Sequence, residues 1–189
     1  MTLLKDILEN VTNSIKDIFT SYDRSDKWLE YLLGSTLTHC IICSERLYKI
    51  YDQSNAPELP EHERCACHLA PLRSLKAGTA TKKGIEGADY YLMYFGKLPD
   101  YYITKDEAKM LGWVSKKGNL AEVAPGKMIG GDEFSNEEDL LPPAPGRIWY
   151  ECDIDYEDGY RNNYRLVYSN DGLIFKTDAH YDRFIEIRR

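Results

Sequence analysis

Five residues near the end of the chain combine the side chains that acid–base chemistry at a phosphodiester requires. They are one carboxylate, two guanidiniums, one imidazole and one phenol, carried by Glu151, Arg161, Arg165, His180 and Tyr181. Without a metal, such a cleavage needs a base for the attacking hydroxyl, an acid for the leaving oxygen and fixed positive charge for the phosphate. A carboxyl group with a pKa of about 4.3 and an imidazole with a pKa of about 6.5 leave a pH window in which both are charged. The set therefore predicts a proton-transfer site without a catalytic cofactor.

The elements that must position these residues show the period-two pattern of β-strands. Between 148 and 154 the apolar residues fall on one face, while Trp149, Glu151 and Asp153 share the other. Arg165 begins a similar alternation, and the sequence Ser169-Asn-Asp-Gly172 predicts a tight hairpin turn into a strand over 173–177. We expect Glu151 and Arg165 to face a cleft opposite the apolar set, and Cys152 to be a buried, unreactive thiol.

Helices are expected before these strands. One is predicted over 86–95 and ends at Gly96, and a second begins with a capping box, Thr104 to Glu107, and ends near Gly112. Helices followed by an antiparallel meander indicate an α+β fold, with the helices packing beside the sheet.

The first part of the chain reads differently. Apolar residues at three-and-four spacing predict an amphipathic helix over 3–20, docked on its own domain, and a second helix is predicted from Trp28 to Leu33, ending at Gly34. Residues 54–71 are rich in proline and charge and are expected to form a loop. The run KAGTATKKG has the composition of a linker. We therefore divide the chain into a mostly helical, cysteine-rich region (1–75), a linker (76–83) and a second domain (84–189).

Charge and composition narrow the classes of function. The 189 residues carry a net charge of −7, which argues against bulk attraction to nucleic acid, so any such site must be a local basic cluster. No apolar run is long enough to cross a membrane, and residues 1–22 lack the basic start and unbroken apolar stretch of a signal peptide. We expect no membrane partner. The location is expected to be cytoplasmic, or extracellular after delivery as an effector by a non-classical or phage-linked route.

Two runs in the second half carry a family resemblance: PDYYITKDEAKMLGWVSKKGNLAEVAPGKMIGGDEFSNEEDLLP and GRIWYECDIDYEDGYRNNYRLVYSNDGLIFKTDAHYDRFIEIR. Over residues 84–188 the chain resembles the barnase family of microbial guanyl-specific ribonucleases. The resemblance implies the microbial ribonuclease fold and cleavage of RNA to a 2′,3′-cyclic phosphate. It also implies Glu151 as the general base, His180 as the general acid, and Lys105, Arg161 and Arg165 as the cations around the phosphate.

The resemblance further implies a guanine-binding loop. Its members are Phe134, Ser135, Asn136 and Glu138, with Tyr181 beside the bound nucleotide. In the family, backbone amides of this loop meet the O6 of the base, and the carboxylate at Glu138 takes its N1 and N2 protons. Glu137 stands where the family has an arginine that helps to hold both the guanine loop and an acidic, barstar-like inhibitor. Because Glu137 reverses the charge at this position, we expect it to affect both guanine preference and the binding of such an inhibitor.

Cysteine and histidine residues gather in the first half. The pattern Cys40-x2-Cys43, followed by His62-x2-Cys65, has the spacing of a tetrahedral zinc site, with Cys67 as an alternative fourth ligand. The alternative is a group of reduced thiols in a small core. The same stretch, as CIIC, LYKIYD and PELPEHERCAC, resembles the end of phage head-morphogenesis (minor head) proteins.

Two functions follow from these resemblances. The first is an endoribonuclease that acts as a toxin or effector behind a shortened phage-derived region. The second is a phage-derived structural or interaction protein whose nuclease domain is inactive. The complete set of Lys105, Glu151, Arg161, Arg165 and His180 favours the first.

Overall fold

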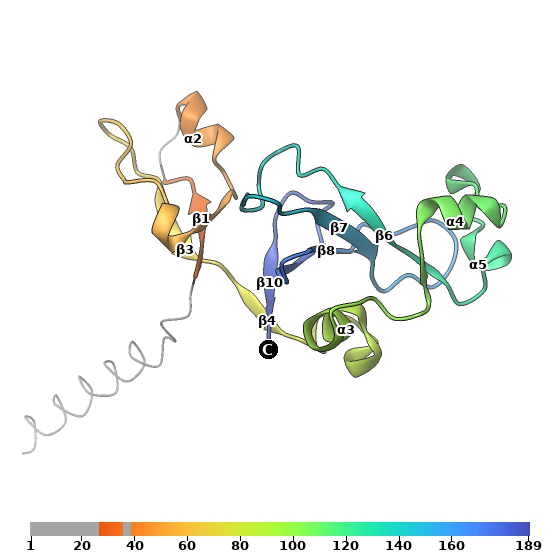
Figure 1. The fold of residues 1–189 in the computed structure, drawn as a ribbon. Coiled ribbons are helices and arrows are strands. Elements are labelled where there is room, and N and C mark those ends of the chain that lie inside the picture. The colour runs from red at the N-terminus through yellow and green to blue at the C-terminus, as the bar shows by residue number, and fades with distance from the viewer. Residues whose placement is uncertain (1–26, 36–38) are drawn as a thin grey trace, which may run out of the picture.

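The computed structural model describes residues 27–35 and 39–189, and it contains two β-sheets (Figure 1). The helix predicted over 3–20 lies outside the described residues. Figure 1 shows the small sheet at one end of the large sheet and the helices α4 and α5 at the other. No helix within the described residues has the length and apolar character needed to cross a lipid bilayer.

The large sheet has seven strands in the order β4-β10-β9-β8-β7-β6-β5. Its two outer pairs, β4 with β10 and β5 with β6, are parallel, and the other pairs are antiparallel. The strands are β4 (Ser74–Lys76), β5 (Tyr102–Ile103), β6 (Met128–Phe134), β7 (Trp149–Asp153), β8 (Arg165–Ser169), β9 (Ile174–Thr177) and β10 (Ile185–Arg188). The expected meander with its hairpin turn after Ser169 is confirmed.

Helices cover one face of this sheet. The helix α3 (Ala88–Phe95) packs on Cys152, Leu166 and Ile174, and it ends at Gly96, whose φ of 67° suits a residue without a Cβ. At the far end, α4 (Lys105–Met110) and α5 (Leu120–Val123) enclose a separate apolar cluster against β6. The predicted helix, the capping box and an α+β arrangement are thus confirmed. Short 3-10 turns lie at Gln53–Asn55, Gly84–Glu86 and Ser115–Lys117.

The opposite face of the large sheet is partly covered by the small sheet, which consists of β2 (Ile50–Asp52), β1 (Trp28–Leu32) and β3 (His68–Pro71), all antiparallel. One core cluster joins the two sheets and contains Trp28, Ile50, Leu72, Leu141, Trp149, Val167, Phe175 and Phe184. Trp149, which was expected to share a face with Glu151, belongs to this core together with Val167. This face is apolar where the small sheet covers it.

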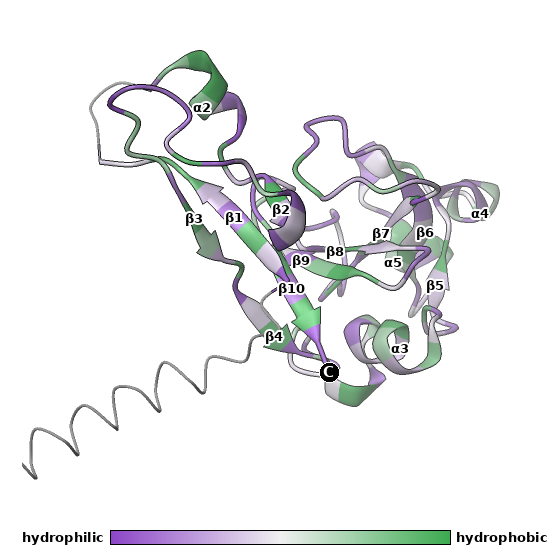
Figure 2. Ribbon diagram, turned by 60° about the vertical axis from the view of Figure 1, so that its left-hand side comes forward, coloured by the Kyte–Doolittle hydropathy of each residue, from purple (hydrophilic) through white to green (hydrophobic). Residues whose placement is uncertain are grey.

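The predicted helix from Trp28 to Leu33 was also wrong, because the segment is strand β1. Its residues form hydrogen-bonded ladders with both β2 and β3, and such distant partners outweigh a short apolar pattern. Gly34 does not end a helix. A Cβ there would lie 2.1 Å from the carbonyl oxygen of Ala66, so glycine permits a close approach of two backbones. The described part of the first region is thus not mostly helical: its regular elements are short strands and one short helix, α2 (Ile41–Glu45). Figure 2 shows the hydrophobic colour of α2, where Ile41 and Ile42 are exposed.

The segment expected to be a linker packs as part of the second half. Lys76 ends β4, and Ala77 and Ala80 are buried in the cluster beneath α3. Asp89 at the start of α3 accepts hydrogen bonds from the backbone nitrogens of Gly78, at 2.7 Å, and Ala80, at 3.0 Å. Small residues allow this tight wrapping, which explains a composition that resembles a linker. Similarly, the expected loop over 54–71 ends in strand β3.

Candidate active site

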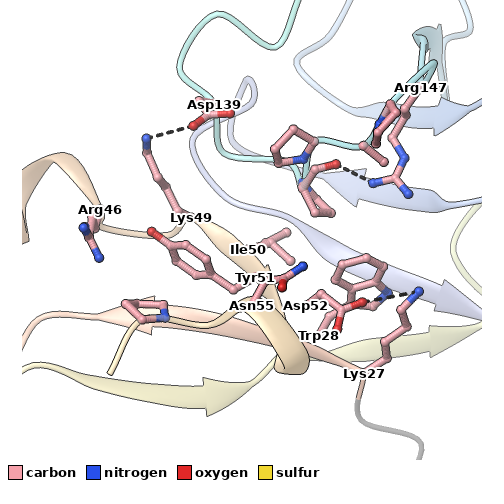
Figure 3. A pocket seen from close by; sticks show the side chains of 15 residues that line it. Lys27, Trp28, Arg46, Lys49, Ile50, Tyr51, Asp52, Asn55, Asp139 and Arg147 are labelled. Carbon is pink, nitrogen blue, oxygen red and sulfur yellow. Dashed lines mark hydrogen bonds and ion pairs between the residues drawn. The ribbon is translucent and has the colours of Figure 1, made fainter. Parts of the chain in front are cut away.

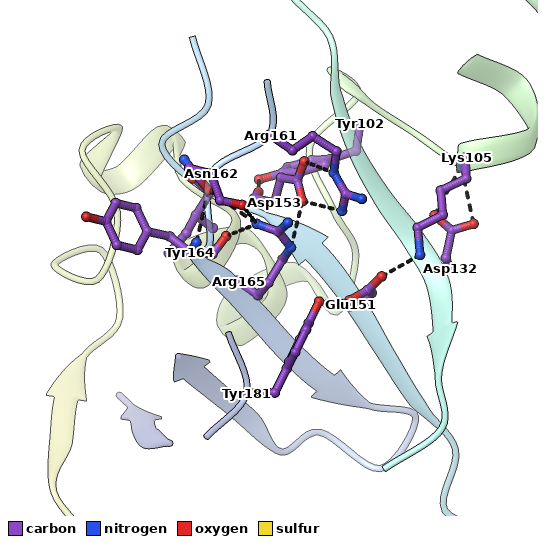
Figure 4. A network of polar contacts seen from close by, with 11 residues as sticks. Tyr102, Lys105, Asp132, Glu151, Asp153, Arg161, Asn162, Tyr164, Arg165 and Tyr181 are labelled. Carbon is purple, nitrogen blue, oxygen red and sulfur yellow. Dashed lines mark hydrogen bonds and ion pairs between the residues drawn. The ribbon is translucent and has the colours of Figure 1, made fainter. Parts of the chain in front are cut away.

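The carboxylate of Glu151 lies within a network of polar side chains that includes Lys105, Asp153, Arg161, Arg165 and Tyr181 (Figure 4). Glu151 is only 6% exposed, and its side chain projects from β7 (Trp149–Asp153). Lys105 Nζ lies 2.5 Å from one carboxylate oxygen, and the Tyr181 hydroxyl donates a hydrogen bond to the other. Burial raises the pKa of Glu151, but these hydrogen bonds and the charge of Lys105 outweigh it, so the pKa lies below the usual range. Glu151 is therefore ionised at neutral pH, as a general base must be.

Lys105 reaches Glu151 because the start of α4 is fixed in two ways. The side chain of Thr104 accepts a hydrogen bond from the backbone nitrogen of Glu107, whose carboxylate accepts one in return from Thr104. The backbone nitrogen of Lys105 itself donates to the carboxylate of Asp132 on β6, at 3.1 Å. The capping box found in the sequence thus places a cation at the site.

Asp153 organises the two guanidiniums and was not predicted as a site residue. It is fully buried on β7, two residues beyond Glu151 and on the same face. Arg161 makes a two-pronged contact with its carboxylate, at 2.7 and 2.6 Å, and Arg165 Nε lies 2.9 Å from one oxygen. Asp153 thereby holds two positive charges beside Glu151. The charge of Arg161 also lowers the pKa of Glu151 and so favours its ionised form. Only the alternation along the strand could have indicated this role.

His180 and Tyr181 come from the loop that follows β9. Both have left-handed backbone conformations, with φ of 51° and 74°, which are unfavourable for residues with a Cβ. The Thr177 hydroxyl supports the turn by accepting a hydrogen bond from the backbone nitrogen of Tyr181, at 3.1 Å. Burial, followed by the hydrogen bond to Glu151, raises the pKa of Tyr181, so its phenol stays protonated. His180 is exposed, and its ring centre lies 5.0 Å from that of Tyr181, whose hydroxyl contacts Glu151.

The loop predicted to bind guanine lies next to this group. Phe134, at the end of β6, stacks on Tyr181 with 4.9 Å between ring centres. The Asn136 side chain exchanges two hydrogen bonds of 3.0 Å with the backbone of Leu141, which closes the loop. Asn136 thus holds the loop together. Ser135, Glu137 and Glu138 are exposed on its outer side.

A hollow of about 670 Å³ lies elsewhere, between the small sheet and the proline-rich segment 142–145 (Figure 3). It is lined by Lys27, Trp28, Lys49, Tyr51 and Arg147, among others. None of the five predicted catalytic residues borders it. The candidate reaction site is therefore the polar network around Glu151 and not this hollow.

The cysteine and histidine residues of the first half come together beside the small sheet. The Nε2 of His62 is 3.2 Å from the sulfurs of both Cys40 and Cys43, and Cys43 and Cys65 are 3.8 Å apart. Cys67 groups with Cys43 and Cys65. A tetrahedral zinc ion with Zn–S bonds of about 2.3 Å and Zn–N bonds of about 2.0 Å holds its ligand atoms roughly 3.5–3.8 Å apart. The spacing of Cys40, Cys43 and His62 is close to that of such an ion, and Cys65 and Cys67 form a second close group that shares Cys43.

Comparison with known proteins matches the second half of the chain. Residues 88–188, just over half of the chain, match the protein-family model for ribonuclease. The chain is 60% identical over 103 residues to a ribonuclease of Heyndrickxia coagulans, of which it covers 94%. It has the same identity over 103 residues to ribonucleases of Bacillus intermedius and Bacillus pumilus, but covers 64% of their lengths. Each of these matches takes in 54% of this chain. The family region includes every predicted catalytic residue, whereas the small sheet precedes it.

Proposed function

Because this chain belongs to the ribonuclease family and is an endoribonuclease, we propose that it cleaves single-stranded RNA after guanine, by transphosphorylation to a 2′,3′-cyclic phosphate. The setting of Glu151 is the observation that supports this mechanism best. Its two oxygens are held by a lysine and a tyrosine, and two guanidiniums are fixed on the same face of the sheet.

In the proposed reaction Glu151 removes the proton from the ribose 2′-hydroxyl, and the freed oxygen forms a bond to phosphorus. Lys105, Arg161 and Arg165 offset the charge that develops on the phosphate oxygens. As the bond from phosphorus to the 5′-oxygen breaks, His180 gives that oxygen its proton. Glu151 ends protonated and His180 deprotonated, so their roles are reversed when water opens the cyclic product.

The assay that tests this mechanism is cleavage of a guanine-containing dinucleotide by the whole chain in EDTA. We expect activity to persist and the product to carry a 2′,3′-cyclic end. Loss of activity in EDTA that is restored by Mg²⁺ would contradict the mechanism. Restoration by Zn²⁺ but not Mg²⁺ would instead indicate a stabilising role for the cysteine-rich region.

The low pKa of Glu151 predicts how activity depends on pH. Glu151 acts as a base only when ionised, so kcat/KM should fall as the pH drops through its pKa, which lies below the usual range. Lys105→Ala removes a charge and a hydrogen bond that favour the ionised form, so this acid limb should move to higher pH. Lys109→Ala is the matched control, because Lys109 lies on the same helix but pairs with Asp106. Acid limbs that coincide in the wild type and Lys105→Ala would show that Lys105 does not set the charge of the base.

Guanine preference is proposed for the loop next to Tyr181. The two hydrogen bonds between Asn136 and Leu141 close the loop, and its backbone amides would bind the O6 of the base. Glu138, exposed on the loop, would accept the N1 and N2 protons, a pattern that the edge of adenine does not offer. Stacked Phe134 and Tyr181 supply an aromatic surface beside it.

Glu137 adds negative charge to this loop, which predicts weaker binding of RNA than an arginine would give. We expect Glu137→Arg to lower KM severalfold at low salt and to leave kcat little changed, because binding and not proton transfer is altered. Glu122→Arg makes the same change of net charge at an exposed position on α5 and should have a smaller effect. Glu137→Arg should also bind an acidic, barstar-like inhibitor faster. A KM that is unchanged at low ionic strength would place Glu137 away from the substrate.

For the first half we propose a structural zinc ion held by Cys40, Cys43, His62 and Cys65, with Cys67 as the alternative ligand. The Nδ1 of His62 lies 3.0 Å from the carbonyl oxygen of Glu63. A proton donated there leaves the Nε2 lone pair facing the sulfurs, as second-sphere partners of zinc ligands commonly arrange. Four protein ligands without an open position are typical of structural and not catalytic zinc.

Elemental analysis of protein purified without added metal should therefore find about one zinc ion per chain. Cys43→Ser should abolish it, because Cys43 belongs to both groups of close donors. Cys152→Ala serves as the control, since Cys152 is buried beneath α3 in the other sheet. Metal-free protein with titratable thiols would support the alternative of a reduced thiol core.

A further inference from the structure

The small sheet contacts both loops of the candidate active site. We call residues 178–184, which include His180, the acid loop, and residues 135–141, which include Asn136, the guanine loop. The backbone nitrogen of Ile50 on β2 donates to the carbonyl oxygen of Leu140, at 2.8 Å, and Lys49 pairs with Asp139 at 3.2 Å. The guanine loop is therefore joined to the small sheet at two consecutive residues, Asp139 and Leu140.

The acid loop is held by a stronger contact. Arg183 donates from Nε and from a terminal nitrogen to the two carboxylate oxygens of Glu30 on β1, each at 2.7 Å. Its guanidinium also lies 4.9 Å from the ring centre of Tyr48. Two parallel hydrogen bonds fix the orientation of a guanidinium as well as its position. Glu30 is 3% exposed, so solvent hardly competes for its carboxylate.

The position of Arg183 gives this contact a consequence for the chemistry. Arg183 lies three residues after His180, and the next residue, Phe184, is buried in the core shared by the two sheets. Between β9 and that anchor, His180 and Tyr181 adopt consecutive left-handed conformations. Such conformations persist only where surrounding contacts hold them. The hydroxyl of Thr177 supports one end of the loop, and Glu30 supports the other.

We propose that Glu30 is a positioning residue for His180, acting through Arg183, and that the small sheet is thereby a working part of the catalytic apparatus. This inference rests on the proposed role of His180 as the general acid. Glu30 would not touch the substrate. It would keep the imidazole where the leaving 5′-oxygen departs, and a small displacement of an acid can reduce turnover strongly.

The variant Glu30→Gln tests the inference with little risk to folding. Glutamine keeps the size of the side chain and is readily buried, and Arg183, whose side chain is 42% exposed, can be solvated by water. Two substrates separate positioning from general damage. Guanylyl dinucleotides release an alkoxide that needs a proton, whereas guanosine 3′-(4-nitrophenyl phosphate) releases a phenolate that does not.

If Glu30 positions the acid, Glu30→Gln should lower kcat on the dinucleotide by about tenfold, a change of about 1.4 kcal/mol in the barrier, with KM little changed. Turnover of the nitrophenyl ester should stay within about twofold of the wild type. Adding Arg183→Gln should lower the dinucleotide rate no further, because the two residues act through one contact. Lys27→Gln is the control: it breaks the Lys27–Asp52 ion pair beside the small sheet without touching either loop, and should change neither rate.

Equal losses on both substrates would mean general damage to the fold and would overturn the inference, as would an unchanged dinucleotide rate. His180→Ala, measured in parallel, should lower only the dinucleotide rate. If it does so while Glu30→Gln has no effect, the inference fails and the proposed mechanism stands. If His180→Ala spares both substrates, His180 is not the acid and both proposals are overturned.

Discussion

Replacing Glu151 by alanine should lower kcat by on the order of 10²–10⁴, the contribution that a positioned general base typically makes. Within residues 27–35 and 39–189, the two side chains that form hydrogen bonds with its carboxylate, Lys105 and Tyr181, act as donors and cannot replace it as a base. The measurement is steady-state cleavage of a guanylyl dinucleotide near neutral pH. Binding should change less than turnover, since the base acts on a proton that moves only during the reaction.

The partner of Glu151 provides a sharper test. His180→Ala should cause a loss in the same range, and the double variant should be much less impaired than the product of the two single losses predicts, because both residues serve one path of proton transfer. Glu157→Ala is a suitable control, as Glu157 is an exposed acid paired only weakly with Lys82, at 3.3 Å. A Glu151→Ala enzyme that keeps turnover within a few-fold of the wild type would show that another group is the base.

Asp153→Ala should be the most destabilising of these substitutions and should also reduce activity. It leaves two guanidiniums near the sheet without their carboxylate, and Arg165 is itself only 4% exposed. Breaking a buried ion pair in this way costs about 3–5 kcal/mol of unfolding free energy. Activity should fall as well, because the positive charges lose their fixed positions beside Glu151.

The loss of unfolding free energy is measured by urea unfolding, from the midpoint and the slope of the transition. Asp171→Ala is the matched control, because Asp171 also pairs with an arginine, Arg147, but is itself half exposed, so a loss of only about 0–1 kcal/mol is expected. If both variants lose similar amounts, the arginines beside Asp153 find other partners, and Asp153 does not organise the site.

The parts of the fold that the sequence predicted correctly are those set by local rules. Alternation fixed β7 and the face of Glu151, and the turn at Ser169–Gly172 fixed the pairing of β8 with β9. The capping box from Thr104 to Glu107 fixed the start of α4. Each of these signals lies within a few residues, so no knowledge of distant contacts was needed.

The parts that were missed depend on contacts between distant residues. The segment Trp28–Leu32 becomes a strand because of β2 and β3, and its apolar pattern is too short to distinguish a helix from a strand. Asp153 looks like any acid on a strand until Arg161 and Arg165 converge on it. Glu30 is separated by 153 positions from Arg183. No spacing rule within the sequence connects such residues.

The parallel pairing of β4 with β10 has a consequence for any shortened form of this enzyme. Residues 74–76 pair with the outer edge of β10, and the backbone nitrogen of Ala77 donates a hydrogen bond to the carbonyl oxygen of Arg188, at 2.6 Å. A fragment trimmed to the region shared with other ribonucleases would lose this cover and present β10 as an open sheet edge. Open edges recruit strands from other molecules and favour aggregation. A fragment that begins at Ser74 should self-associate less than one that begins at Ala88, because both lack the small sheet but only the first covers β10.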